Sequence, residues 1–133
     1  MARMDKSFPR RILLVDDDAE SRGLHALMLT AEGYEVAQTG SGIEAINLHR
    51  KQPFDLIVTE VILQQKDGYE TIMELVRKPV STRLIATSKS SWISAELSLR
   101  MARQIGAHFT LAKPFPAEHL LATVRKALGE RMN

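Results

Sequence analysis

The sequence contains no cysteine among its 133 residues. Disulfide bonds, zinc sites built from thiolates and cysteine nucleophiles are therefore excluded. No apolar run approaches the roughly 20 residues that a membrane-spanning helix needs, and the first residues are too polar for a secretory signal. We therefore expect a cytoplasmic protein that does not enter a membrane.

An excess of charge of one sign is also missing, because the formal net charge is only +2 at pH 7. A small basic cluster lies near the start of the chain: Arg3, Lys6, Arg10 and Arg11. We interpret residues 1–10 as a solvated basic N-terminal arm. Nucleic-acid-binding modules combine a basic face with aromatic or groove-entering elements, and the sequence shows no such pattern. It therefore predicts no direct contact with nucleic acid.

The remaining composition is that of an ordinary globular protein, with 44% hydrophobic and 26% charged residues. The length suits one domain with one core. We therefore expect a single domain over residues 1–133, with its core at about residues 11–128.

Segments typical of strands alternate with segments typical of helices from Arg11 onward. Short apolar runs predict strands at residues 12–15, 34–38, 56–58, 83–86 and 108–111. Each of them is followed by a segment with helical periodicity. Because crossovers between parallel strands are right-handed, this alternation predicts an α/β fold with helices on both faces of a parallel sheet.

The predicted helices are defined by apolar stripes and by residues suited to their ends. The three clearest stripes are Leu24, Leu27, Met28 and Ala31, then Tyr69, Ile72, Met73 and Val76, then Ala117, Leu120, Leu121, Val124 and Leu128. Asp18 is predicted to cap the first helix, and Ser41 with Glu44 forms a capping box for the second. Gly33 is suited to a left-handed cap, and Pro116 to the first position of the last helix.

Polar residues follow or end four of the predicted strands: Asp16, Asp17 and Asp18, then Glu60, then Thr87, then Lys113. In parallel sheets of this kind, ligands bind beyond the carboxyl ends of the strands. Clustered carboxylates repel one another, and a divalent cation such as magnesium relieves that repulsion. A lysine and a hydroxyl beside such a metal would provide a binding site for a phosphoryl group.

Taken together, these motifs resemble the receiver domain of two-component response regulators over about residues 11–128. The matching segments are ILLVDDD at 12–18, EGYEV at 32–36, GSGIEA at 40–45, FDLIVTE at 54–60, Asp67-Gly68, LIATS at 84–88, and Gly106-Ala107 through Lys113-Pro114-Phe115. The resemblance implies a flavodoxin-like, doubly wound (βα)5 fold whose five-stranded parallel sheet has the order 2-1-3-4-5.

The resemblance also implies a role for each residue at the predicted site. Asp16 and Asp17 would be the acidic pair that holds magnesium, and Glu60 and the backbone carbonyl of Ile62 would complete its ligands. Magnesium is therefore the cofactor that the resemblance implies, and Glu60 would weaken or abolish its binding.

Two further roles at the site follow from the same resemblance. Thr87 would be the switch hydroxyl that turns toward a phosphoryl group. Lys113 would form an ion pair with that group, and its bond to Pro114 would be cis.

The chain departs from the family at Glu60, which stands where the family has its phosphoacceptor aspartate. The extra methylene moves the carboxylate outward by roughly 1.5 Å, and attack geometry tolerates only about 1 Å of error. The same shift would let Glu60 meet Lys113 and Thr87 without phosphorylation. Two hypotheses follow: Glu60 mimics the phosphorylated state and biases the domain toward it, or it is a lost acceptor in a static interaction module.

Two further departures concern the signal readout. Thr110 occupies a position that is often aromatic in the family, and Gln64 replaces the usual proline. Both changes weaken the expectation that the domain signals through its fourth and fifth helices.

We favour a regulatory, non-enzymatic module that binds a protein partner, either a histidine kinase or a downstream regulator. One alternative is a phosphorylation-competent response regulator that receives a phosphoryl group from a histidine kinase. A more distant alternative is a magnesium-dependent phosphohydrolase of the haloacid dehalogenase type, with Asp16 as nucleophile and Asp18 as general acid. The family also allows a homodimer through the face of the fourth helix, fifth strand and fifth helix.

Overall fold

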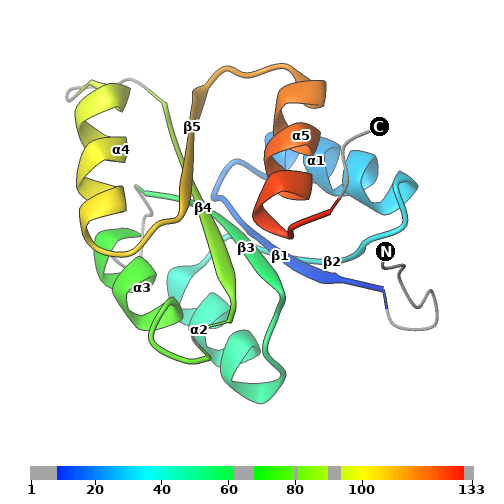
Figure 1. Ribbon diagram of the computed structural model, residues 1–133, viewed down its shortest axis with the longest axis horizontal. Coiled ribbons are helices and arrows are strands. Elements are labelled where there is room, and N and C mark those ends of the chain that lie inside the picture. Colours follow the sequence, from blue (N-terminus) through cyan, green and yellow to red (C-terminus); the bar gives the residue numbers. More distant parts are fainter. Residues whose placement is uncertain (1–8, 62–67, 80, 90–93, 131–133) are drawn as a thin grey trace.

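Five parallel strands form one sheet at the centre of the protein, in the order β2-β1-β3-β4-β5 (Figure 1). This computed structural model describes residues 9–61, 68–79, 81–89 and 94–130. The strands are β1 (Arg11–Val15), β2 (Glu35–Thr39), β3 (Leu56–Glu60), β4 (Arg83–Lys89) and β5 (Phe109–Lys113). The predicted α/β class and strand order are therefore confirmed.

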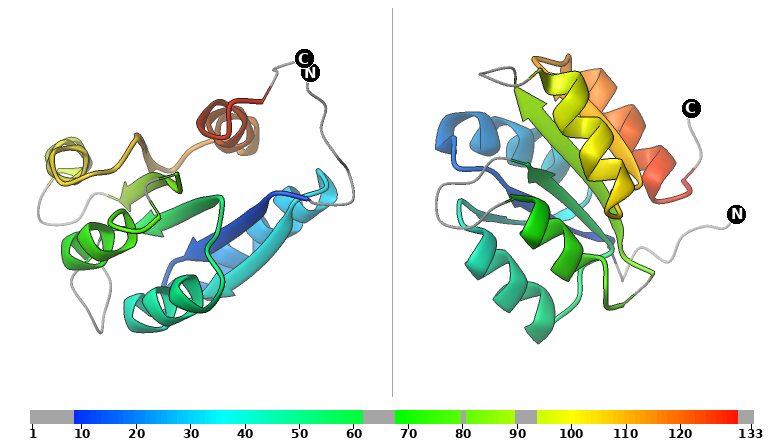
Figure 2. Two further views of the ribbon diagram at one scale, coloured as in Figure 1. Left: turned by 60° about the horizontal axis from the view of Figure 1, so that its bottom comes forward. Right: turned by 90° about the vertical axis from the view of Figure 1, so that its left-hand side faces the viewer.

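Helices cover both faces of this sheet, as the right-handed crossovers require (Figure 2). The helices are α1 (Ala19–Ala31), α2 (Gly42–Lys51), α3 (Gly68–Leu75), α4 (Ala95–Gln104) and α5 (Ala117–Ala127). One core layer packs α1 and α5 against the sheet, and the other packs α2, α3 and α4 against its opposite face. None of the helices in the described ranges is long and apolar enough to cross a bilayer.

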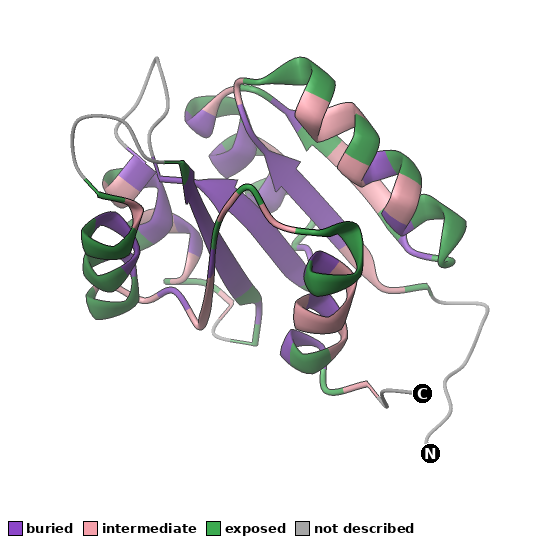
Figure 3. Ribbon diagram, turned by 90° about the horizontal axis from the view of Figure 1, so that it is seen from above, coloured by how far each residue is buried: buried purple, intermediate pink, exposed green. Residues whose placement is uncertain are grey.

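The inner strands β1 and β3 are almost wholly buried because both faces of the sheet are covered. Ile12 and Leu14 point into the layer under α1 and α5, whereas Leu13 and Val15 point into the opposite layer. All five residues of β3 are buried, and Figure 3 shows the buried strands enclosed between half-exposed helices. Glu60 is thus carried into the interior by the last position of a fully buried strand.

The predicted helix ends are largely confirmed. The Asp18 carboxylate accepts a hydrogen bond from the Ser21 amide at 3.2 Å, and the Ser41 hydroxyl accepts one from the Glu44 amide at 3.2 Å. Glu44 does not reach back to Ser41, however, because its carboxylate accepts from the Thr39 hydroxyl.

The remaining cap predictions concern Gly33 and Pro116. Gly33 has a φ of 97°, in the left-handed region that glycine allows. Pro116 is the N-cap of α5 and not its first residue, a difference of one position.

Of the four residues in the predicted apolar stripe of α1, Met28 packs against the core and the other three are exposed, so the stripe is largely wrong. Leu24 and Leu27 are 64% and 70% exposed, and the helix instead buries Ala26 and Leu29. Polar side chains explain this rotation, since Arg22 and His25 lie on the sheet side of the helix, where they contact the site described below. A prediction from apolar periodicity considers hydrophobic residues alone. It therefore ignored Arg22 and His25 and predicted the wrong buried face for α1.

Some predictions fall on other bounds or outside the described ranges. In the predicted stripe of α3, Met73 is exposed, while Ile72 is buried. β4 continues past Thr87 to Lys89, and β5 is displaced toward Lys113. Several predictions lie outside the described residues: Arg3 and Lys6 of the basic arm, the carbonyl of Ile62, Gln64, and Asp67.

Two histidines accept backbone hydrogen bonds near the amino ends of the strands. His49 Nδ1 accepts from the Phe54 amide at 3.1 Å, and His108 Nδ1 accepts from the Leu84 amide at 3.0 Å. Burial lowers the pKa of both imidazoles, because it penalises the charged form. Each hydrogen bond requires an unprotonated Nδ1.

We therefore expect the free energy of unfolding to fall as the pH drops from 7 to 5. As the pH falls, the histidines of the unfolded chain take up protons first, near pH 6.5, because their pKa is higher there than in the folded protein. The free energy of unfolding therefore decreases between pH 6.5 and the lowered pKa of the folded state. His49→Asn retains an acceptor near Nδ1 and removes the titration, so urea unfolding at several pH values should show a weaker pH dependence. His119→Asn, on the exposed surface of α5, is the control. Equal slopes for wild type and His49→Asn would contradict this account.

Candidate functional site

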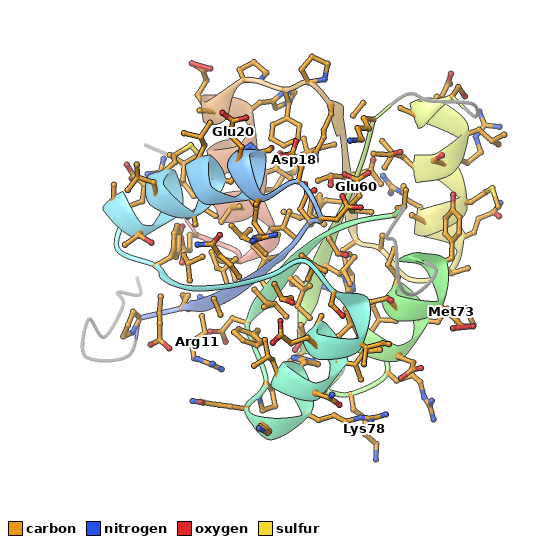
Figure 4. All side chains as sticks on the ribbon, turned by 180° about the vertical axis from the view of Figure 1, so that it is seen from behind. Arg11, Asp18, Glu20, Glu60, Met73 and Lys78 are labelled. Carbon is orange, nitrogen blue, oxygen red and sulfur yellow. The ribbon has the colours of Figure 1, made fainter. Side chains whose placement is uncertain are left out.

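The carboxyl ends of the strands bring the predicted polar residues to one edge of the sheet. Asp16 directly follows β1, Glu60 ends β3, and Lys113 ends β5. Glu60 is the register partner of Thr87 on β4. Figure 4 shows Glu60 and Asp18 at this same edge. Three residues far apart in the sequence thus become neighbours because parallel strands end together.

Lys113 joins two carboxylates at this edge. Its Nζ lies 2.9 Å from Glu60 Oε1 and also donates a hydrogen bond to Asp16 Oδ2. The three side chains are largely withdrawn from solvent, with 2% exposure for Glu60, 10% for Asp16 and 13% for Lys113. We call Asp16, Glu60 and Lys113 the triad; it ties β1, β3 and β5 together.

The charges of the triad depend on one another. Burial raises the pKa of Glu60, and Asp16 adds to this effect, while Lys113 opposes it. Burial by itself would lower the pKa of Lys113, but Asp16 and Glu60 outweigh it and raise that pKa. Lys113 is therefore a firmly protonated ammonium held between two carboxyl groups.

Asp16 is fixed from several sides. Its Oδ1 accepts a hydrogen bond from the Asp18 amide at 2.9 Å, and its own amide donates to the Thr39 carbonyl at 3.1 Å. The Arg22 guanidinium donates to the Asp16 carbonyl. Arg22 was not predicted as a site residue, since nothing in the sequence motif marks it and only the rotation of α1 brings it here.

Three of the residues predicted to bind magnesium lie within the described ranges: Asp16, Asp17 and Glu60. Asp16 and Glu60 are brought together, but through Lys113. Asp17 is half-exposed, and Asp18 caps α1. Ile62 lies outside the described residues, and within them no cluster of three or more histidine, aspartate or glutamate side chains could hold a metal ion.

Thr87 contributes to a small pocket beside the triad. The pocket has a volume of about 10 Å³, and Asp16, Lys113, His25 and Phe115 are among its other lining residues. The His25 ring stacks on Phe115 with 5.2 Å between ring centroids. Burial and the nearby Lys113 lower the pKa of His25. His25 and Phe115 therefore line the site on the side of α1 and α5, and sequence reasoning missed both.

The backbone next to Lys113 has the geometry that the resemblance implied. The peptide bond between Lys113 and Pro114 is cis, which confirms that prediction. Thr110, which the sequence analysis singled out, is half-buried on β5.

Comparison with known proteins identifies a matching family. The family model for the response regulator receiver domain matches residues 12–125. A crystal structure of a CheY-like response regulator receiver domain protein from Methanospirillum hungatei superposes with a TM-score of 0.84, covering 92% of this chain and 95% of that chain. At 24% sequence identity, this likeness concerns the fold alone.

Curated relatives are longer than this chain. The transcriptional regulatory protein PdtaR of Mycobacterium tuberculosis is 33% identical over 126 residues, which are 94% of this chain and 60% of PdtaR. The transcriptional regulatory protein ZraR of Escherichia coli is 36% identical over 119 residues, which are 89% of this chain and 26% of ZraR. The chain thus spans at most about three fifths of these relatives.

Proposed function

Since the chain belongs to the response regulator receiver domain family, we propose that it regulates a protein partner in two-component signalling without being phosphorylated itself. Receiver domains in general are signalling modules that interact with histidine kinases and effector domains. The phosphorylation independence is the specific part of this proposal, and it depends on Glu60.

The observation that carries the proposal is the ion pair between Glu60 and Lys113. In a receiver with an acceptor aspartate, the lysine at this position would pair with the phosphoryl group. Here Lys113 Nζ already lies 2.9 Å from a carboxylate oxygen of Glu60. This contact supports the hypothesis that Glu60 supplies the negative charge to which Lys113 responds.

Burial makes this pair more than a surface salt bridge. A partly exposed pair contributes at most about 1 kcal/mol, whereas the loss of one partner from a buried pair costs several kcal/mol. Because Glu60 is almost fully buried, the pair can exert a stronger bias than the sequence alone suggested. A complete shift between two states would still require about 5.5 kcal/mol of differential stabilisation. We therefore propose a bias toward the active form.

Phosphorylation should be restored by shortening the side chain. When the protein is incubated with magnesium and a small-molecule phosphodonor, we expect Glu60→Asp to gain one phosphoryl group and the wild type to gain none. The reason is that only aspartate leaves room for attack at the correct distance. Intact-mass spectrometry measures the outcome, and Glu60→Gln is the control without an acceptor. Labelling of the wild type would instead support the phosphorylation-competent regulator.

The partner is proposed from the family and the curated relatives. PdtaR and ZraR are transcriptional regulatory proteins. We propose that this domain contacts a histidine kinase or a downstream effector, with any nucleic-acid binding carried out by the effector. A homodimer through α4, β5 and α5 remains a prediction.

The geometry gives no support to the phosphohydrolase alternative. Its nucleophile would be Asp16, whose Oδ2 is bound to Lys113, and its general acid would be Asp18, which caps α1. Both carboxylates are thus engaged in structural contacts.

A further inference from the structure

We propose that the edge of the sheet where the strands begin is a docking surface for an acidic segment of a protein partner, and that Arg83 and Lys126 bind carboxylates of that segment. This edge lies at the opposite end of the strands from the triad. The inference gives a chemistry to the partner of the module proposed above, and to that extent it rests on the proposed function.

The charges of the domain are divided between the two ends of the strands. Each of the helices α1 to α5 has an acidic residue in its first turn, on the same side as the triad: Glu20, Glu44, Glu70, Glu96 and Glu118. Cationic residues gather where strands begin and helices end, and we call the following set the basic edge: Arg10, Arg11, Lys78, Arg83, Arg125 and Lys126. Figure 4 shows this division, with Arg11 and Lys78 at one end and Glu20 and Glu60 at the other.

Helix dipoles explain only part of this division. Basic residues near the end of a helix stabilise it, as Arg125 and Lys126 do in the last turn of α5. Arg83 is the first residue of β4, however, and Arg10 directly precedes β1. These two arginines stabilise no helix end, so the basic edge has more positive charge than the helices require.

The carboxylates near the basic edge do not neutralise all of it. They are paired with arginines: Glu35 with Arg11 at 3.0 Å, Glu32 with Arg125 at 2.9 Å, and Asp55 and Glu130 with Arg10 at 4.0 and 3.8 Å. Lys78, Arg83 and Lys126 are exposed, and they form no ion pair with a carboxylate in the parts of the chain that the structure describes. Their charges are therefore available to a partner.

A cleft of about 380 Å³ lies among these cations. Arg10, Arg83 and Lys126 line it from three different elements, and Asp55 is the carboxylate in its lining. Asp55 already accepts a hydrogen bond from the Arg11 amide at 2.7 Å, besides its ion pair with Arg10. Pockets of roughly 300–1,000 Å³ hold small ligands, so this cleft can accommodate one or two carboxylate side chains of a docked segment.

The shape of the basic edge favours an acidic peptide over a nucleic acid. Proteins that bind single strands offer exposed aromatic rings for base stacking, and those that read duplex DNA insert a helix or a β-ribbon into a groove. Phe54, the aromatic residue in the lining of the cleft, is buried and offers no such surface. An acidic peptide requires only exposed cations and a cleft for its side chains, and complementary charge favours its encounter with this edge.

Fluorescence anisotropy of a short fluorescein-labelled oligoglutamate peptide tests this surface. We expect saturable binding by the wild type at low ionic strength, and weaker binding as salt is added, because exposed charges are screened. Arg83→Gln and Lys126→Gln should each weaken binding about fivefold, the effect of losing one exposed ion pair. The matched control is Lys89→Gln, which removes one positive charge at the opposite end of β4 and should bind as the wild type. Circular dichroism checks that each variant is folded.

Three results would overturn the proposal. The first is a wild type that does not bind the peptide, or that binds an oligoglutamine peptide equally well. The second is an affinity of Arg83→Gln and Lys126→Gln no lower than that of Lys89→Gln, which would mean that net charge alone attracts the peptide. The third is tighter binding of a labelled single-stranded oligonucleotide of the same charge, which would assign the basic edge to nucleic acid. The test involves neither Glu60 nor a phosphodonor, so its failure is distinguishable from a failure of the phosphorylation test.

Discussion

Replacing Gly68 with alanine is expected to lower the free energy of unfolding by about 3 kcal/mol or more, among the largest effects of any single substitution. A Cβ added at Gly68 would lie 1.8 Å from the carbonyl oxygen of Val61 and 2.2 Å from its carbonyl carbon. These are backbone atoms, so no side-chain rotation can relieve the clash. The start of α3 must therefore move away from the end of β3.

This clash also reaches the functional site. The Val61 amide donates to the Thr87 carbonyl at 3.0 Å, and Val61 directly follows Glu60. A shift of Val61 would therefore disturb the pairing of β3 with β4 where the triad is held. Urea unfolding followed by circular dichroism measures the loss.

The matched control for Gly68→Ala is Gly23→Ala in α1. A Cβ at Gly23 has open space around it, and alanine is favoured over glycine inside a helix by about 0.5–1 kcal/mol. Gly23→Ala should therefore be neutral or stabilising. A Gly68→Ala variant as stable as the wild type would show that α3 can slide away from β3 at little cost.

Removing the ammonium of the triad with Lys113→Met is expected to cost about 3–5 kcal/mol of stability. The substitution leaves Asp16 and Glu60 facing each other without a counter-charge in a largely buried site. Part of the cost will be offset when Glu60 takes up a proton, because its pKa is already raised by burial. The loss should therefore be smaller at pH 5 than at pH 8, as measured by urea unfolding.

A double-mutant cycle isolates the contribution of the pair. Glu60→Gln combined with Lys113→Met should cost clearly less than the sum of the two single substitutions, because the double variant no longer holds an unpaired Glu60 carboxylate. Lys51→Met, at an exposed position, should change stability by no more than about 0.5 kcal/mol. Strict additivity of the two triad substitutions would mean that Glu60 and Lys113 do not interact energetically.

Much of the fold could be predicted because its signals are local. Buried parallel strands need continuous apolar runs, and Asp18, Ser41 and Gly33 mark helix ends through their own backbone contacts. The strand order came from the resemblance of the motifs to a known family. The stripe of α1 failed, because Leu24 and Leu27 satisfy the helical period but do not face the sheet.

The sequence by itself determined which polar residues would arrive at one edge of the sheet. The carboxyl ends of parallel strands lie at the same edge of the sheet. Asp16, Glu60 and Lys113 follow or end such strands, so they are expected at that edge. The identity of residue 60 as glutamate also comes from the sequence alone.

Only the tertiary structure decided how these residues pair. Lys113 and Asp16 are 97 positions apart, and their contact depends on side-chain directions and burial that no local pattern encodes. The rotation of α1 likewise placed Arg22 and His25 beside the site, and the close approach of α3 to Val61 left room only for a glycine at position 68. These features arise from packing between distant elements, and such packing is settled only when the whole core forms.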